Sequence, residues 1–163
     1  MEHVILRDIE ARDDAALAAV IRSCMEEFGV NRPNTVYFDP HTDRLSEVFR
    51  DEPRSHYFLA TLDGKVLGGA GIYPTDQLPP DTCELVKMYL LPEARRMGLG
   101  GDLIGKCLEK ARSLGYRSIY LESMPELTRA ISVYERFGFR HLAGPLGNSG
   151  HSGCAVWMLK DIS

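Results

Sequence analysis

The sequence predicts a mixed α/β fold in which helices flank a sheet of about seven strands, mainly antiparallel. Runs rich in β-branched and aromatic residues alternate with segments whose apolar residues recur every three or four positions. The strands in the middle of the chain form a meander, and a strand–helix–strand crossover follows them. The chain has 163 residues, enough for a stable core, so we expect residues 1–163 to form a single domain.

The first part of the chain is predicted to supply one strand and two helices. The strand covers residues 3–9, and Asp13 follows it as a candidate helix cap. The next helix has an apolar face with helical spacing and ends at Gly29. Residues 30–41 contain two prolines and are predicted to form a loop, and a second short helix is expected at about 42–51.

A β-hairpin and a longer strand are predicted in the middle of the chain. Two strand-like runs, 55–62 and 65–73, are separated only by Asp63 and Gly64. This dipeptide suits a two-residue turn, because both turn positions require positive φ. After a loop that contains prolines, residues 82–91 form the longer strand.

The remaining elements follow a glycine-rich segment. A helix is expected from the glycines to about residue 114, and a strand at 117–123. In the next helix Pro125 suits the first position, because proline is already fixed at a helical φ there. The last two strands are expected at 139–144 and 154–162.

Charge and cysteine content exclude several classes of function. The net charge is −4, so neither a nucleic acid nor a membrane surface is an expected partner. We recognise no signal peptide and no apolar run of about 18 residues, so we expect a cytoplasmic protein. The cysteines have neither C-x-x-C nor zinc-finger spacing, which predicts reduced thiols and no metal site. They are Cys24, Cys83, Cys107 and Cys154.

The segment LPEARRMGLGGDL, between the longer strand and a helix, has the chemistry of an anion site. The free N–H groups and the dipole at a helix start attract negative charge. Gly98, Gly100 and Gly101 lack side chains that would hold a ligand away from the backbone. Arg95 and Arg96 would add charge-assisted hydrogen bonds to phosphate. The segment therefore predicts a cradle for a diphosphate.

Two common phosphate cradles fit this segment poorly. A P-loop needs Lys followed by Ser or Thr after its last glycine, whereas Asp102 and Leu103 follow Gly101. The dinucleotide fingerprint would need a third glycine at the position of Leu103. Glu122 is placed to be its ribose-binding acid, but too little chain remains for a second nucleotide-binding half.

A third pattern fits the segment, and a second motif supports it. The spacing Arg95-x-x-Gly98-x-Gly100 resembles the loop with which the GNAT family of N-acetyltransferases holds the pyrophosphate of acetyl-coenzyme A (acetyl-CoA). The segment SVYERFGF is similar to the family's second signature, with Tyr134 four residues before Gly-Phe and Ala130 four residues before that tyrosine. The expected order of strands also matches, so the resemblance covers nearly the whole chain.

The resemblance implies a GNAT fold, acetyl-CoA as co-substrate and no metal. It implies acetyl transfer to a primary amine of a small molecule or peptide, directly within a ternary complex. Homodimers are common in the family, so a homodimer is possible. The backbone of Met88, Tyr89 and Leu90 is expected to meet the pantetheine arm. The residues expected at the pyrophosphate are Arg95, Arg96, Met97, Gly98, Leu99, Gly100 and Gly101.

Glu84 is the candidate general base. It lies eleven residues before Arg95, an offset similar to that of the catalytic glutamate in the family's histone acetyltransferases. Strand alternation places it on one face with Val86 and Met88, and burial there would raise its pKa toward neutrality. The alternative is a solvated glutamate at a strand edge, with the amine proton passing through water to bulk solvent.

Tyr134 is the candidate general acid. The resemblance implies that its hydroxyl lies near the cofactor sulfur, where it would protonate the leaving thiolate. The alternative is core packing, because Ile131 and Phe137 lie on the same helical stripe. The family often has an asparagine where this chain has Leu127, so that cofactor contact is missing or is replaced, by Ser123 or Arg129 in the nearby sequence.

The acceptor is expected to contact two loops, the first at residues 29–41 and the second at residues 144–153. His151 and Cys154 lie in or beside the second loop, and a Cys-His nucleophile is conceivable, but the sequence provides no evident acid to orient the histidine. Tyr37, Asp39 and His41 lie in the first loop, and Asp39 or Glu27 would suit a cationic acceptor unless both are merely solvated. Two other functions stay open, a non-catalytic acyl-CoA sensor and an acyltransferase with another acyl-CoA donor.

Overall fold

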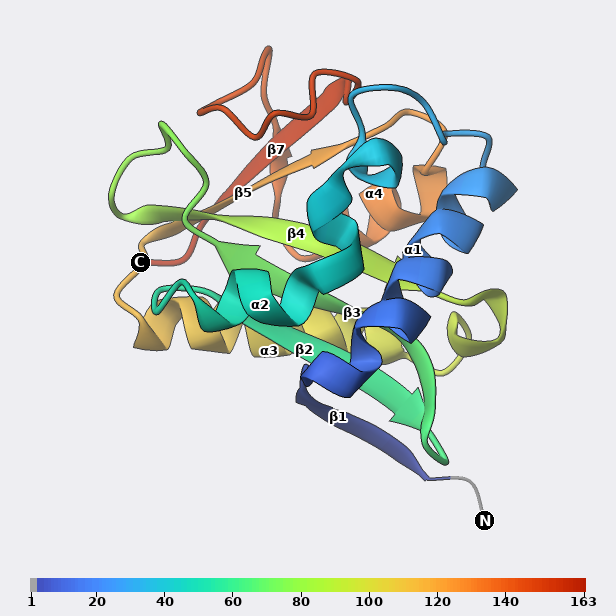
Figure 1. Cartoon of the computed structure of the whole chain (residues 1–163). Helices are drawn as coiled ribbons and strands as arrows, with labels where there is room; N and C mark the ends of the chain where they lie inside the picture. The colour runs from blue at the N-terminus through green and yellow to red at the C-terminus, as the bar shows by residue number, and fades with distance from the viewer. Residues whose placement is uncertain (1–2) are drawn as a thin grey trace.

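A computed structural model describes residues 3–163, and within them a seven-stranded sheet runs through the molecule (Figure 1). The strand order is β1-β2-β3-β4-β5-β7-β6, and every neighbouring pair is antiparallel except β4 and β5. The strands are β1 (Val4–Asp8), β2 (His56–Leu62), β3 (Lys65–Tyr73), β4 (Thr82–Leu90), β5 (Ser118–Ser123), β6 (Arg140–His141) and β7 (Val156–Asp161). The predicted fold class and the predicted order of elements are therefore confirmed.

Helices cover both faces of the sheet. They are α1 (Asp14–Glu27), α2 (Leu45–Arg50), α3 (Leu99–Ser113) and α4 (Thr128–Arg136). Helices α1 and α2 lie in front of the sheet in Figure 1, and α3 and α4 lie behind it. Each pair of helices buries its apolar stripe in a separate hydrophobic cluster against the sheet. No helix within residues 3–163 combines the length and the apolar character that crossing a membrane requires.

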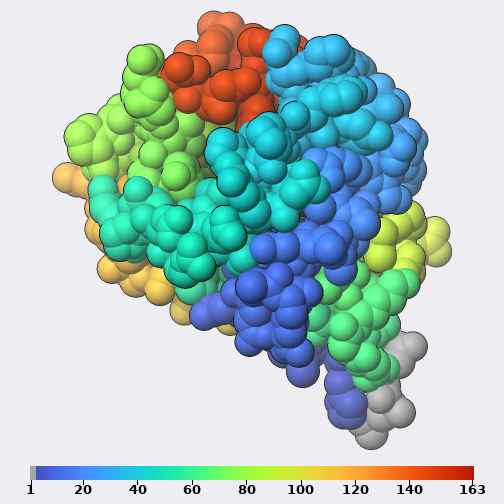
Figure 2. All heavy atoms as spheres, in the orientation of Figure 1, coloured from blue at the N-terminus to red at the C-terminus, as the bar shows by residue number. Residues whose placement is uncertain are grey.

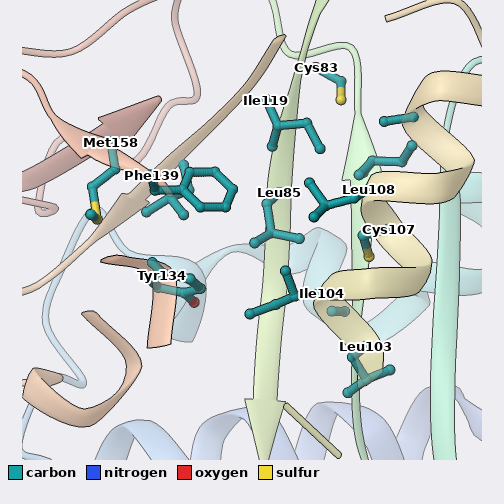
Figure 3. Close-up of a cluster of buried hydrophobic side chains, with 14 of the residues drawn as sticks. Cys83, Leu85, Leu103, Ile104, Cys107, Leu108, Ile119, Tyr134, Phe139 and Met158 are labelled. Atoms are coloured by element: carbon teal, nitrogen blue, oxygen red, sulfur yellow. The ribbon is translucent and has the colours of Figure 1, made fainter. Parts of the chain in front are cut away.

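The cluster behind the sheet joins α3, α4 and the two strands on either side of the parallel pairing. Figure 3 shows Ile104 and Leu108 of α3 beside Leu85 of β4 and Ile119 of β5, with Tyr134 of α4 nearby. Ile104 and Ile119 are fully buried. Burying a Leu or Ile side chain contributes roughly 1.5–3 kcal/mol, so this cluster fixes α3 and α4 firmly relative to β4.

The hairpin turn follows the sequence prediction, but two helix starts do not. Asp63 has φ 48° and Gly64 has φ 86°, as the two-residue turn requires. Asp13 does not cap α1 with its side chain. Its carboxylate instead accepts hydrogen bonds from the Arg7 guanidinium, at 2.8 Å, and from a backbone N–H one turn earlier. Pro125 is not the first residue of α4, which begins at Thr128 after a separate turn.

Candidate active site

The site lies where β4 and β5 separate. Thr82–Glu84 pairs in parallel with Ser118–Tyr120, and the two strands diverge beyond this point (Figure 1). A cavity of about 330 Å³, here called the central cavity, opens in the gap. Its wall consists of β4 from Glu84 onward, the end of β5, α4, the end of α1 and part of the loop at 142–155. Because β4 has no strand partner on this side, its backbone is available to a ligand.

A β-bulge shapes the β4 side of this cavity. The register between β3 and β4 slips so that Lys87 and Met88 together oppose Ala70. Lys87 has φ 53°, a left-handed conformation that is costly for a residue with a long side chain. The hydroxyl of Tyr57 donates a hydrogen bond to the Lys87 carbonyl at 2.7 Å and holds the bulge in place.

The bulge corrects one prediction about β4. Simple alternation places Glu84, Val86 and Met88 on one face, and this is wrong for Met88. Val86 packs against the cluster in front of the sheet, whereas Met88 packs with Leu85 behind it. The extra residue in the bulge reverses the alternation, because every side chain after it points to the opposite face.

Glu84 is buried at the inner end of the central cavity. Its residue is 5% exposed, and the Thr75 hydroxyl donates a hydrogen bond to its carboxylate at 2.6 Å. Burial raises the pKa of Glu84 to about 7, and the nearby charge of Glu122 acts in the same direction. A carboxyl group with this pKa exchanges protons readily at neutral pH, which a general base requires.

Tyr134 belongs both to the core and to the central cavity. The residue is 7% exposed, and its ring packs edge-on against Phe139 with centroids 6.0 Å apart (Figure 3). It also lines the central cavity. Burial raises the pKa of its hydroxyl above the ordinary value, so the phenol remains protonated and is able to donate a proton.

The glycine segment forms a second hollow beside the central cavity. Gly98 has φ 74° and precedes α3, whose N-terminus receives no hydrogen bond from a capping side chain. Gly100 lines both this hollow and the central cavity, and a Cβ there would lie 3.4 Å from the end of the Met88 side chain. The residues that line this α3 hollow are Arg95, Gly98, Gly100, Gly101, Arg129, Val133, Arg136 and Phe137. Uncapped amides beside guanidinium groups suit a diphosphate.

The arginines of the α3 hollow differ in what they contact. The Arg95 guanidinium makes two hydrogen bonds to Glu27, at 2.7 and 2.8 Å, and lies over the Phe28 ring. These hydrogen bonds lower the pKa of Glu27, and its exposed carboxylate is already paired with Arg95. Arg129 and Arg136 lie seven residues apart and approach the hollow from α4. Sequence reasoning did not identify Arg136, although its seven-residue spacing from Arg129 puts both on one helical face.

The other residues predicted at the pyrophosphate are placed as follows. Leu99 packs its side chain into the core, so only its backbone faces the segment's surface. Arg96 and Met97 are exposed. Leu127, which stands where the family often has asparagine, lines the central cavity together with Ser123 and Arg129.

The two loops expected at the acceptor contact each other beside the central cavity. Figure 2 shows residues 142–155, in red, packed against the light-blue segment after α1. Asp39 accepts a hydrogen bond from the Nε2 atom of His151 at 3.0 Å, although 112 residues separate them. The expectation that His151 has no orienting acid is therefore wrong, because the acid comes from the other loop.

The pKa values of several groups near this contact differ from their ordinary values. Burial alone would raise the pKa of Asp39, but hydrogen bonds from His151 and His41 lower it to about 2. Burial and the charge of Lys87 lower the pKa of His151, so its imidazole is neutral at pH 7. Burial raises the pKa of Cys154 to about 12, which keeps the thiol protonated. A Cys-His nucleophile is therefore unfavourable, because the thiolate is the reactive form.

Glu122 closes the far side of the central cavity. Its carboxylate accepts hydrogen bonds from the Tyr120 hydroxyl at 2.7 Å and from the Ser149 hydroxyl at 2.5 Å. The second bond ties the loop at 142–155 to the end of β5. Within residues 3–163 the His, Cys, Asp and Glu side chains form no group of three or more arranged to hold a metal ion.

Comparisons with known proteins agree with this architecture. The model of the acetyltransferase (GNAT) family matches residues 17–139. The chain is 38% identical over 160 residues to YjgM of Escherichia coli (strain K12), described as an uncharacterized N-acetyltransferase, covering 97% of this chain and 95% of that protein.

Two solved structures share the fold. A GNAT-family acetyltransferase from Staphylococcus aureus Mu50 superposes with a TM-score of 0.86 at 18% identity, covering 99% of this chain and all of that one. The PaiA N-acetyltransferase of Thermoplasma acidophilum, solved with coenzyme A, superposes with a TM-score of 0.76 at 17% identity, covering 98% and 99% of the two chains. The chain belongs to the GNAT family of acetyltransferases.

Proposed function

We propose that this protein transfers the acetyl group of acetyl-CoA to a primary amine of a small molecule or peptide, directly within a ternary complex. One observation carries the proposal: the central cavity connects an unpartnered edge of β4 and the glycine segment with the buried carboxyl group of Glu84. A cofactor with a diphosphate and a long amide-containing arm matches these surfaces in turn.

The α3 hollow and β4 would hold the cofactor. The amides of Gly98–Gly101 and the guanidinium groups of Arg129 and Arg136 suit the pyrophosphate. The β4 backbone at Met88–Leu90 suits the pantetheine amides, because that edge lacks a strand partner. A structural neighbour of the same fold was solved with coenzyme A, which supports acetyl-CoA as the cofactor.

Glu84 and Tyr134 would handle the protons. A bound acetyl thioester supplies an activated carbonyl carbon. The amine nitrogen forms a bond to that carbon, the carbon–sulfur bond breaks, and an amide and a free thiol result. Glu84 accepts the proton that the ammonium group loses, and the Tyr134 hydroxyl protonates the departing thiolate. Direct transfer is favoured because burial keeps the Cys154 thiol protonated.

Calorimetric titration with acetyl-CoA tests the cofactor assignment. Gly100→Trp places a bulky side chain at a residue that lines both cavities and should abolish micromolar binding. Gly105→Trp is the matched control, because a Cβ at Gly105, on the same helix, meets no atom within 4 Å, and Gly105 lines neither cavity. Equal affinity in both variants, or no binding to the folded wild type, would refute the assignment.

Two further assays separate the alternatives. Thiol release with a panel of primary amines is expected only from an enzyme, whereas a sensor would bind acetyl-CoA and release none. Competition between acetyl-, propionyl- and succinyl-CoA identifies the donor. We expect acetyl-CoA to give the highest kcat/KM, and a higher value for a larger acyl group would reassign the donor.

A further inference from the structure

Lys87 places a cation in the wall of the central cavity, which His151 and Cys154 also line. The part of the cavity next to these residues is here called the acceptor end. Its charge interacts with Asp39 and Glu84, and it lowers the pKa of His151. No carboxylate within residues 3–163 lies at salt-bridge distance from its ammonium group, and no buried nitrogen in this range lacks a partner, so the group opens into the cavity. Burial lowers the pKa of Lys87, so an additional anion beside it would be stabilising.

The carboxylates around the cavity are already engaged by other groups. Asp39 accepts hydrogen bonds from two histidines, at 3.0 and 2.9 Å. Glu84 accepts one from Thr75, and Glu122 accepts two from hydroxyl groups. None of these hydrogen bonds involves Lys87, so none of these carboxylates occupies its ammonium group. A carboxylate on the ligand would give this ammonium group the direct anionic partner that it lacks among the described residues.

The backbone holds Lys87 in this position at a conformational cost. Lys87 has φ 53°, a conformation in which glycine or asparagine is usual. The Tyr57 hydroxyl donates a hydrogen bond to its carbonyl oxygen and so fixes the backbone there. Two glycines of β3 make room for that tyrosine. A Cβ at Gly69 would lie 2.5 Å from the Tyr57 ring, and one at Gly71 would lie 2.6 Å from it. Strain maintained by packed neighbours is typical of functional positions.

We infer that Lys87 binds a carboxylate of the acceptor, so that the acceptor is an amino acid or a similarly small amine that also carries a carboxylate. The inference rests on the proposed acetyl transfer and names the class of amine. Glu84 would receive the proton of the amine while Lys87 pairs with the carboxylate. The cavity of about 330 Å³ must also admit the acetyl end of the donor, which favours an acceptor with a small reacting end.

Matched pairs of acceptors test this inference. Thiol release is measured with each common amino acid, with β-alanine and with γ-aminobutyrate, and then with the carboxamide of each. The carboxamide keeps the amine and the shape but removes the negative charge. We expect wild-type kcat/KM to favour the best carboxylate over its carboxamide by about tenfold or more, since a charged hydrogen bond is lost.

Three variants test whether Lys87 causes the preference for a carboxylate over a carboxamide. Lys87→Met should bring the carboxylate and the carboxamide to similar kcat/KM values, mainly through a higher KM for the carboxylate. Lys87→Arg should retain part of the preference, because it keeps the charge. Lys106→Met, an exposed position on α3, should leave the preference unchanged. Calorimetry should show the same affinity of all three variants for acetyl-CoA.

Several results would overturn the inference. One is thiol release that is as fast with carboxamides, or with amines that lack a carboxylate, as it is with amino acids. Another is a carboxylate preference that survives in Lys87→Met. A third is stoichiometric acetylation of Lys87 itself, detected by peptide mass spectrometry after incubation with acetyl-CoA, because Lys87 would then be the acceptor. Binding of acetyl-CoA without thiol release in the presence of any amine would instead refute the proposed function, and the inference with it.

Discussion

The α3 hollow and the acceptor end of the central cavity are built from the chain in different ways. The α3 hollow comes from two nearby stretches, the glycine segment before α3 and one face of α4. The acceptor end joins Asp39, Lys87 and His151, which lie in two loops and a strand bulge. A backbone cradle of the first kind leaves a short motif in the sequence, whereas side chains assembled from distant segments leave none.

The difference also separates two uses of charge. In the α3 hollow, helix amides and arginines offer fixed positive charge to a ligand. At the acceptor end, burial and mutual pairing shift the pKa values of acids, a lysine and a histidine. One end suits tight binding of a constant cofactor group, and the other suits proton exchange and discrimination between acceptors.

The largest expected effect is at Glu84, which is buried in the central cavity. Glu84→Gln should lower kcat by about a hundredfold or more at pH 7, with acetyl-CoA affinity unchanged. The pKa of Glu84 is raised to about 7 and the base acts when ionised, so the wild-type rate should rise with pH through about 7 and then level off. The variant should lose that rise. A small decrease with an unchanged pH profile would favour a water relay to bulk solvent.

A smaller but clear loss is expected at Tyr134. Tyr134→Phe should lower kcat by roughly tenfold to a hundredfold, because the thiolate loses its proton donor while the ring keeps its packing on Phe139. Tyr73→Phe, which removes a hydroxyl outside the cavity, is the control. Stopped-flow measurement of thiol release would compare them. An unchanged rate in Tyr134→Phe would leave Tyr134 as a core residue only.

Two arginines of the α3 hollow are expected to differ in their effect on cofactor binding. Arg129→Gln should raise the Kd for acetyl-CoA by about tenfold, because a guanidinium bond to phosphate is lost. Arg95→Gln should change that Kd little but lower the free energy of unfolding by about 1 kcal/mol, because its side chain is bound to Glu27. Calorimetry and urea unfolding of both variants would measure the two effects. The reverse pattern would place the Arg95 side chain on the cofactor.

The smallest expected effect is at Asp39, and it concerns stability. The pKa of Asp39 in the folded protein is lowered to about 2, so the ionised carboxylate stabilises the fold above its ordinary value of 3.8. Asp39→Asn should lower the free energy of unfolding by about 1 kcal/mol at pH 7. The difference should disappear as the pH falls through about 2. A difference independent of pH would show that packing, not charge, links the two loops.

Much of the fold was predictable because its signals are local. The hairpin follows from Asp63 and Gly64, and the α3 hollow from glycines next to a helix start. The bulge at Lys87 was not predictable, because no residue type in β4 indicates a bulge. The residues that hold it, Tyr57 and the glycines of β3, lie in the neighbouring strands. The shift of α4 away from Pro125 likewise depends on a turn that the proline does not specify.

The acceptor end shows the same limit more strongly. Asp39 and His151 are unremarkable loop residues in the sequence, and only the fold brings them within 3.0 Å of each other. In the sequence Lys87 is typical of a solvated strand residue. In the structure it lies in the bulge and lines the cavity. Glu84 was predictable as a candidate, but its raised pKa depends on burial that alternation alone cannot measure.

Amide hydrogen exchange with and without acetyl-CoA tests the location of the site most directly. We predict slower exchange at the amides of Gly98–Gly101 and Met88–Leu90 on binding, with little change at 146–153 until an acceptor amine is added. Protection confined to the acceptor loops, or binding that leaves both backbone segments unchanged, would contradict the assignment of the α3 hollow and the β4 edge to the cofactor.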